Sequence, residues 1–496
     1  FVFHSKRPTD LFQRLAPSKM PRAMKPNSTF ISVTCLFAIL MWNTWSSCPE
    51  VSRESTAPVP PSRVVEIDVS QNFVNRSWMI PESVEEYFAG GEDLMRRYFT
   101  KSLSYAGTLD ALRSALLEGV TRGKLRIGIG GGSVSVGGNC HDDTQRRWFT
   151  TLKNALERGF ALRSVALDVQ IINAAQGATG PSRLAYCLDE LLPESVDILI
   201  FEYAINEGGG MWSEVLLRQF QPAKTALFFL ETFSMKGPIG QGFDSSQQYH
   251  DILARYYDIP LLSARDAFRD EFIRHPDAAQ RWFADDHHHP SCLGHATLGL
   301  LAAELVFHTF ESVGDHQPIA EAANYTHLTP LYIRPKGSFP ISLHPTCLLA
   351  AHGLLAKQKS TWPRPTGPKP SFDCTGPEDG DLSIPVSCRP SGKDRCQVIL
   401  SYTRSWRPMG VASIYFNTSR TPDFSIDAFA ADWVERKTYW TVQQYTDSDE
   451  DRLKIPMGDT LVRIRCDGSS TAPAEHAVAD SPFSRFTFQV HALVLL

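Results

Sequence analysis

The chain has 496 residues, a formal net charge of -5 and 43% hydrophobic residues. This length indicates two or three domains rather than one, and the apolar fraction is that of a globular protein. Charges of both signs are mixed along the chain, without a basic patch or a long single-sign run, which argues against a nucleic-acid partner and against a charged interaction tail.

The N-terminal part combines basic residues with a short apolar run. The chain begins with Phe1 rather than Met, so Met20 and Met24 are candidate starts. The apolar run over residues 30–42 follows basic residues, which is the pattern of a signal peptide or a signal anchor. A full membrane span needs about 20 apolar residues, which this segment approaches only when residues 28–45 are counted. Both interpretations stay open, and an anchor would make the protein a single-pass type II protein with a lumenal bulk. A buried helix is disfavoured by the polar, proline-containing flanks.

Two further patterns favour the secretory route. Asn75, Asn324 and Asn417 each begin an Asn-x-Ser/Thr sequon, the acceptor sequence for N-glycosylation. Some of the C-terminal cysteines would pair in an oxidising compartment, but the sequence does not reveal their connectivity. These cysteines are Cys374, Cys388, Cys396 and Cys466. Cys187 lies in an apolar, helix-like pattern and is expected to be a buried thiol.

A repeating strand–helix pattern occupies the middle of the chain. Near-continuous apolar runs, predicted as strands, lie at residues 124–133, 167–173, 196–203, 226–230 and 259–262. Helix-like segments lie at residues 108–117, 145–159, 182–192, 213–220, 245–257 and 293–309. Apolar runs are expected where helices cover both faces of a sheet. Strands that alternate with helices predict an α/β domain with a parallel sheet and right-handed crossovers.

The C-terminal part has a different sequence pattern. Prolines recur over residues 314–370, which predicts a linker, and short strand-like runs follow without a long helix between them. Such runs favour a small β-sandwich. We therefore predict a basic segment with a signal peptide or anchor (1–50), a stem (51–90), an α/β domain (91–313), a linker (314–370) and a β-sandwich-like domain (371–496).

A glycine-dense stretch ends the first predicted strand of this pattern. Residues 127–138 read Ile-Gly-Ile-Gly-Gly-Gly-Ser-Val-Ser-Val-Gly-Gly, so Ser133 is the first reactive side chain after the strand. Ligands bind open α/β sheets at this end of the strands, and glycines let a ligand approach the backbone. We predict that Ser133 is a nucleophile. Nucleotide or phosphate binding is disfavoured, because Ser133 occupies the third glycine position of a G-x-G-x-x-G and no Gly-Lys-Ser/Thr follows.

A serine hydroxyl needs a base to take its proton, and the sequence offers one late in the domain. Residues 285–290 read Asp-Asp-His-His-His-Pro. A carboxylate three residues before a histidine can fold back onto the ring and orient it, as in a catalytic triad. We predict His289 as the base and Asp286 as its orienting carboxylate, although Asp285 and His288 have the same spacing. A metal site and a solvated polar loop are the alternatives.

Two other predicted strand ends offer donors for an oxyanion hole. Gly177 follows the second strand and can present its backbone N–H, while Asn206 follows the third and can offer its side-chain amide. Either residue alone is equally compatible with an ordinary turn. Because all of these groups fall where strands give way to loops, we predict an oxyanion hole formed by the N–H groups of Ser133 and Gly177 and the amide of Asn206. We expect no metal and no other cofactor.

With these residues in place, residues 124–313 resemble the SGNH (GDSL-type) hydrolases. That family has a nucleophilic serine after the first strand, an oxyanion glycine and asparagine after the next two, and a late Asp-x-x-His. The matching positions here are Ser133, Gly177, Asn206, Asp286 and His289. Two positions depart from the family pattern: Gly132 replaces the aspartate of Gly-Asp-Ser, and Glu207 follows the asparagine where aspartate is common.

The resemblance implies a flavodoxin-like three-layer fold and serine ester chemistry through an acyl-enzyme. The expected substrate is an acylated small molecule or glycan, with O-acetyl groups as the target. A glycan O-acyltransferase and a non-catalytic carbohydrate-binding protein on the same scaffold are the alternatives. Aromatic residues of the C-terminal part could stack on sugars or fill the sandwich core; they are Trp406, Tyr415, Trp433, Tyr439, Trp440 and Tyr445. The oligomeric state stays open.

Overall fold

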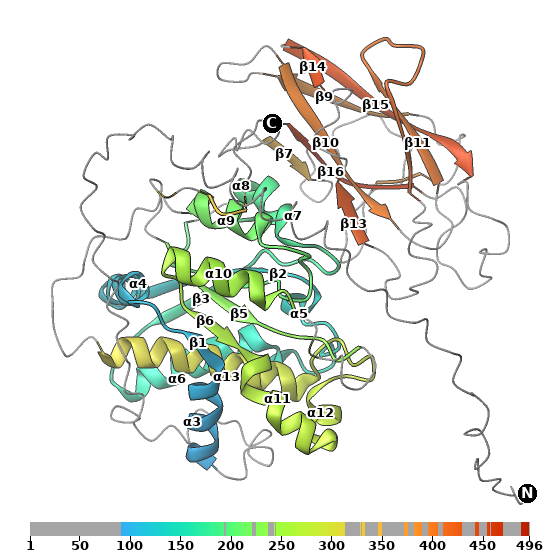
Figure 1. Cartoon of the computed structure of the whole chain (residues 1–496). Helices are drawn as coiled ribbons and strands as arrows, with labels where there is room; N and C mark the ends of the chain where they lie inside the picture. The colour runs from blue at the N-terminus through green and yellow to red at the C-terminus, as the bar shows by residue number, and fades with distance from the viewer. Residues whose placement is uncertain are drawn as a thin grey trace, which may run out of the picture. The chain divides into compact units, whose positions relative to one another are not determined.

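The computed structural model describes residues 91–192, 195–220, 225–236, 243, 245–312, 328, 330–332, 346–349, 372–374, 381–388, 395–404, 410–428, 442–445, 454–456, 458–469 and 488–495. The predicted signal segment and stem, with the sequon at Asn75, lie outside these residues, and so does the sequon at Asn324. The described residues form an α/β domain and an all-β domain (Figure 1).

A six-stranded sheet forms the centre of the α/β domain. Its strands are β1 (Leu103–Tyr105), β2 (Lys124–Gly131), β3 (Asp168–Asn173), β4 (Ile198–Glu202), β5 (Ala226–Glu231) and β6 (Leu261–Ser263), in the spatial order β1-β6-β5-β4-β2-β3. From β2 to β6 all pairings are parallel, and their order is that of the flavodoxin-like fold. The predicted parallel sheet is confirmed, with one addition: β1 joins the edge antiparallel to β6.

Helices cover both faces of this sheet (Figure 1). The helices are α3 (Gly91–Ser102), α4 (Asp110–Arg122), α5 (Ser133–Val136), α6 (Trp148–Leu162), α7 (Pro181–Tyr186), α8 (Leu188–Leu191), α9 (Met211–Phe220), α10 (Gln247–Tyr257), α11 (Ala264–Arg274), α12 (Pro276–Trp282) and α13 (Cys292–Glu311). Side chains alternate along a strand, so Ile198 and Ile200 of β4 lie in one hydrophobic core while Leu199 and Phe201 lie in the other. Both faces of the strand are therefore apolar, which explains the near-continuous runs in the sequence.

The helix α13 is apolar on nearly all sides. Within the described part of the chain it is the one helix long and apolar enough to cross a membrane, and 89% of that stretch is buried inside the protein. A helix that is hydrophobic all round is expected in the centre of a large core. We therefore assign α13 to the core; the predicted anchor segment at residues 28–45 is a separate stretch and lies outside the described residues.

The all-β domain consists of two antiparallel sheets. One has the order β12-β11-β15-β9 and is formed by β9 (Asp381–Cys388), β11 (Gly410–Phe416), β12 (Phe424–Asp427) and β15 (Gly458–Ser469). The other contains β7 (Thr346–Leu349), β8 (Phe372–Cys374), β10 (Arg395–Arg404), β13 (Val442–Tyr445), β14 (Lys454–Pro456) and β16 (Phe488–Leu495). Ile384 and Ile464 of the first sheet share one hydrophobic cluster with Val398 and Leu493 of the second, as in a β-sandwich. The strand β7 lies within the range predicted as a linker and pairs with β16.

The cysteines correct one expectation. Cys187, predicted as a buried thiol, forms a disulfide with Cys347 of β7. It is buried as expected, but an apolar pattern cannot distinguish a thiol from a disulfide whose partner is 160 residues away. Cys388 pairs with Cys396, and Cys466 is disulfide-bonded as well.

Candidate active site

The carboxyl ends of three neighbouring strands place the predicted oxyanion and nucleophile residues at one edge of the sheet. The strand β2 lies between β3 and β4, and near their ends Ile129 pairs with Asn173 while Gly131 pairs with Glu202. The loops that follow the three strands therefore start side by side. Ser133, the first residue of α5, follows β2, while Gly177 and Asn206 lie in the loops after β3 and β4.

The turn into Ser133 has no room for side chains at its two glycines. A Cβ built on Gly131 would lie 2.2 Å from Ser135 Oγ, and one built on Gly132 would lie 2.0 Å from Asn206 Oδ1. Both separations are far below van der Waals contact. The contact at Gly132 gives a physical reason for Gly-Gly-Ser in this chain. The Asn206 side chain fills the space that any side chain at position 132 would need.

Ser133 lies at the end of a hydrogen-bonded chain of three side chains. Its Oγ is 2.7 Å from Nε2 of His289, and Nδ1 of the same ring is 2.6 Å from Oδ2 of Asp286. If Nδ1 carries the proton that it donates to the carboxylate, Nε2 is free to accept the serine proton. The structure thus places His289, not His288, against the serine.

The Asp286 carboxylate is held by four hydrogen bonds. Oδ1 accepts from the backbone N–H groups of His288 and His289, each at 3.0 Å. Oδ2 accepts from His289 and also from Nδ2 of Asn139 at 2.9 Å. Partial burial opposes ionisation, but the bonds from the His289 ring and from the two backbone groups hold the pKa of Asp286 well below its usual range. The carboxylate therefore stays ionised at neutral pH and can stabilise an imidazolium.

The neighbouring histidine has a different role. Nδ1 of His288 lies 2.9 Å from Oγ of Ser234, in the loop after β5. The N–H of Met235 in that loop donates to the carbonyl of His287. Burial, with the charge of His289, lowers the pKa of His288 to about 4, so the ring is neutral near pH 7. His288 thus helps to fasten the histidine loop to the sheet.

The metal alternative for this loop finds no support in its geometry. The two rings of His288 and His289 lie at 85° to each other and bond to different residues, Ser234 and Ser133. Within the described ranges no group of three or more His, Cys, Asp or Glu side chains could hold a metal ion.

The loop after β3 lies against α5 and against the loop after β4. Nδ2 of Asn173 donates to the carbonyl of Ser135 at 2.7 Å, and a Cβ on Gly180 would lie 2.9 Å from the carbonyl oxygen of Asn206. Gly177 lies in the turn between these two contacts. Oδ1 of Asn206 is buried without a partner among the described residues.

Sequence reasoning did not anticipate a buried carboxyl that contacts α5. Glu202, at the end of β4, is fully buried and accepts hydrogen bonds from Ser135 Oγ at 2.9 Å and Thr232 Oγ1 at 2.7 Å. Burial raises the pKa of Glu202 to about 8 although the two hydroxyl groups oppose this. A single glutamate at the end of an apolar run carries no sequence signal for such a role.

A second unanticipated network fixes the residue after Asn206. Nε2 of the fully buried His250 is 2.8 Å from Glu207 Oε2, and its Nδ1 is 2.8 Å from Glu231 Oε1. Burial alone would lower the pKa of His250, but the two carboxylates raise it to about 10. Glu207 Oε1 also accepts from the N–H groups of Trp212 and Ser213 at the start of α9. The glutamate that departs from the family pattern is thus the one that reaches this histidine.

Comparisons with known proteins find likeness in structure but not in sequence. No family model matches the sequence, and no curated protein matches it. A two-domain esterase active on acetylated mannans has a similar structure, with a TM-score of 0.53 and 15% identity over 80% of this chain and 97% of its own. A second crystal structure of such an esterase gives a TM-score of 0.52 and 16% identity over the same shares. An acetyl xylan esterase from Geobacillus stearothermophilus matches 37% of this chain and 94% of its own, with 15% identity and a TM-score of 0.29.

The likeness to the two-domain esterase extends over both domains and shows the fold.

Proposed function

We propose that the protein is a serine esterase that removes O-acetyl groups from a glycan through an acyl-enzyme. The observation that carries this proposal is the chain from Ser133 Oγ through His289 to Asp286, with separations of 2.7 and 2.6 Å. It lies at the edge of the sheet where ligands bind in this fold class.

The geometry supports a two-step reaction. Ser133 Oγ attacks the carbonyl carbon of the ester while Nε2 of His289 takes the hydroxyl proton. The N–H groups of Ser133 and Gly177 and the Asn206 amide would hold the oxyanion. When the C–O bond to the sugar breaks, His289 returns the proton to the leaving sugar oxygen. Water, deprotonated by His289, then attacks the acyl-enzyme, releases acetate and restores the serine.

A glycan substrate is supported by the two-domain esterase of similar fold, which acts on acetylated mannans. The aromatic residues of the all-β domain add little to this. Of the six named above, Tyr415 is the one whose side chain the structure describes; it is 5% exposed, and the guanidinium groups of Arg463 and Arg465 lie over its ring at 5.2 and 4.9 Å. This tyrosine is covered and is not an open stacking platform for a sugar.

We also propose that the protein works in the secretory pathway, secreted or membrane-anchored. Disulfides such as Cys140–Cys292 and Cys187–Cys347 form and persist in oxidising compartments. Asn417, the described sequon residue, is exposed in the turn after β11. Its Oδ1 accepts from the N–H of Leu461, which leaves Nδ2 as the amide atom for a glycan.

The test uses the full chain secreted from eukaryotic cells, as wild type and as Ser133→Ala. Each is assayed with p-nitrophenyl acetate and with acetylated mannan and xylan, and is labelled with a fluorophosphonate. We expect acetate release and labelling of Ser133 in the wild type alone. Equal activity in both proteins would overturn the nucleophile assignment. A folded wild type that neither reacts nor labels would favour a binding protein, and acetyl transfer to an added sugar would identify a transferase.

A further inference from the structure

The turn that follows the nucleophile helix touches every member of the triad. The chain leaves α5 through Gly137, Gly138 and Asn139, with φ values of 90° at Gly137 and 61° at Asn139. A Cβ on Gly138 would lie 2.9 Å from the carbonyl oxygen of Ser133 and 3.2 Å from Cδ2 of His289. The turn therefore runs directly against the serine and the histidine ring.

Asn139 completes the contact with the third member. Its Nδ2 donates to Oδ2 of Asp286 at 2.9 Å, across 147 residues of sequence. The same oxygen accepts from the His289 ring, so Asn139 and His289 share one carboxylate oxygen. A second donor on that oxygen restricts rotation of the carboxylate and keeps Oδ2 directed at Nδ1.

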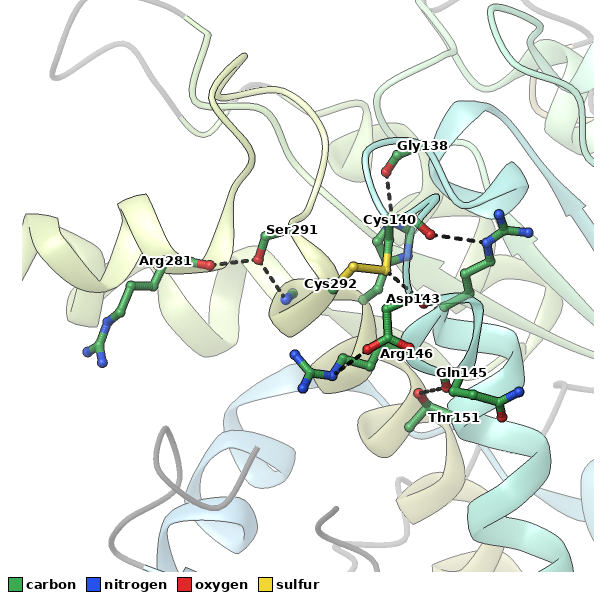
Figure 2. Close-up of a disulfide and its surroundings, with 12 residues drawn as sticks. Gly138, Cys140, Asp143, Gln145, Arg146, Thr151, Arg281, Ser291 and Cys292 are labelled. Atoms are coloured by element: carbon green, nitrogen blue, oxygen red, sulfur yellow. Dashed lines mark hydrogen bonds and ion pairs between the residues drawn. A yellow bond between two sulfur atoms is a disulfide. The ribbon is translucent and has the colours of Figure 1, made fainter. Parts of the chain in front are cut away.

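A disulfide closes this turn onto the histidine side of the site. Cys140, the residue after Asn139, is bonded to Cys292, the first residue of α13 and three residues after His289 (Figure 2). From the same helix, Nε2 of His295 donates to the carbonyl of Gly138 at 3.0 Å. Burial lowers the pKa of His295 to about 4, so the neutral ring keeps this donor near pH 7.

We infer that Asn139 is a positioning residue for Asp286 and that the Cys140–Cys292 disulfide is the clamp that holds it there. This inference rests on the proposed esterase function. The serine and the Asp286–His289 pair lie on segments that are far apart in sequence, and the disulfide joins the ends of both. Breaking it lets the Asn139 turn move away from the carboxylate, so the activity depends on an oxidising environment.

The contact is tested with two substitutions that keep the backbone of the turn. Asn139→Gly tolerates the positive φ and removes the donor; Asn139→Asp keeps the shape and places a second carboxylate against Asp286. We expect an unchanged KM, a kcat lowered by about 10²-fold in Asn139→Asp, the scale of a small misplacement in an active site, and a smaller loss in Asn139→Gly. In an Asp286→Asn background, neither substitution should lower kcat further.

The clamp is tested with Cys140→Ser/Cys292→Ser, and Cys388→Ser/Cys396→Ser is the matched control. We expect the first pair to lose kcat at unchanged KM and unchanged circular dichroism, and the control pair to keep it. Adding Asn139→Gly to the first pair should cost nothing more. If the first pair fails to fold, wild-type protein in graded reductant is used, with alkylation of Cys140 followed beside activity and with the control pair treated alike.

A spectroscopic measurement separates this inference from the proposed function. The proton between His289 and Asp286 is followed by its downfield NMR signal in the full chain without substrate. A signal that moves in Asn139→Gly and on loss of the Cys140–Cys292 bond supports the inference, even if the protein hydrolyses no ester. An active, fluorophosphonate-labelled wild type whose signal and kcat are unmoved by these changes would overturn the inference and leave the esterase function intact.

Discussion

Two histidines of this domain contact both a serine and a carboxylate. They differ in the exposure of the ring and in the number of carboxylates beside it. His289 has Ser133 on one nitrogen and Asp286 on the other, and its side chain is 21% exposed. His250 has Glu231 on one nitrogen, and on the other both Glu207 at 2.8 Å and Ser213 Oγ at 3.2 Å, with no exposure.

The two carboxylates beside His250 set the protonation of its ring. At His250 both ring nitrogens donate to carboxylates, and the pKa of about 10 keeps the ring an imidazolium near neutral pH. An imidazolium has no lone pair with which to take a proton from Ser213, whose hydroxyl already donates to Glu207. A serine, a histidine and a carboxylate in contact therefore do not make a nucleophile. One ring nitrogen must stay free to accept a proton, and the site must be open to a substrate.

The largest expected effect separates the two serines. Ser133→Ala should lower kcat by about 10⁶-fold, as removal of a triad nucleophile does, and should abolish fluorophosphonate labelling. Ser213→Ala should leave labelling intact, because the hydroxyl is buried and its histidine cannot act as a base. Labelling is read by mass spectrometry of the modified peptide. A label on Ser213 would show that this serine also reacts, and would contradict the difference drawn here between the two histidines.

The next effect concerns the oxyanion donor and the glycine beside it. Asn206→Ala should lower kcat by about 10²–10³-fold, the usual cost of one lost oxyanion donor. Gly132→Ala should have a similar effect, because its methyl group would occupy the position of the Asn206 amide. The double variant should be no worse than either single one. Wild-type activity in Gly132→Ala would contradict this account of the glycine, and kinetic constants for all three variants measure it.

A smaller effect on rate is expected from the buried histidine network. Glu207→Gln removes one charge from the pair with His250, and breaking a buried pair typically costs about 3–5 kcal/mol of unfolding free energy. Because Glu207 follows Asn206 directly, we also expect a lower kcat. Glu207→Asp, which restores the residue common in the family, serves as the control for charge. Urea unfolding gives the stability, and a Glu207→Gln protein as stable as the wild type would contradict an ionic network.

The smallest expected effect is a change in how the free energy of unfolding depends on pH, and it is caused by Glu202. Its pKa rises from 4.5 to about 8 on folding, so the folded state keeps a proton that the unfolded state releases. The free energy of unfolding therefore falls as the pH rises from about 4.5 to 8, with a slope of about 1.4 kcal/mol per pH unit for this one group at most. Glu202→Gln should flatten that part of the curve. Urea unfolding at pH 5 and pH 8 measures it, and an unchanged slope would mean that Glu202 is ionised in the folded protein.

The sequence predicts the site residues that can be recognised from a short spacing or from their position directly after a strand. Asp286 and His289 are three residues apart, and Ser133 is the first hydroxyl after a strand, so the pattern identifies them. Asn139 could not be found in this way, since its partner Asp286 is 147 residues away. The same holds for His250, whose two carboxylates come from other segments and whose own surroundings read only as an amphipathic helix.

The fold shows a similar division. Apolar runs identify β2 to β6 because both faces of these strands are buried, while β1 and β7 were not predicted. Each of these is only three or four residues long and becomes a strand only through its neighbour, β6 or β16. Three or four residues are too few to show a periodic pattern.

The bond between Cys187 and Cys347 has a consequence for the intact molecule. Together with Cys140–Cys292 it makes two overlapping covalent rings, residues 140–292 and 187–347, that both enclose Asn206 and His289. A protease that cuts the chain once between residues 313 and 345 opens only the second ring, and both fragments stay joined through Cys187. The nicked protein would therefore migrate as one species on a non-reducing gel and separate into two only when reductant is added.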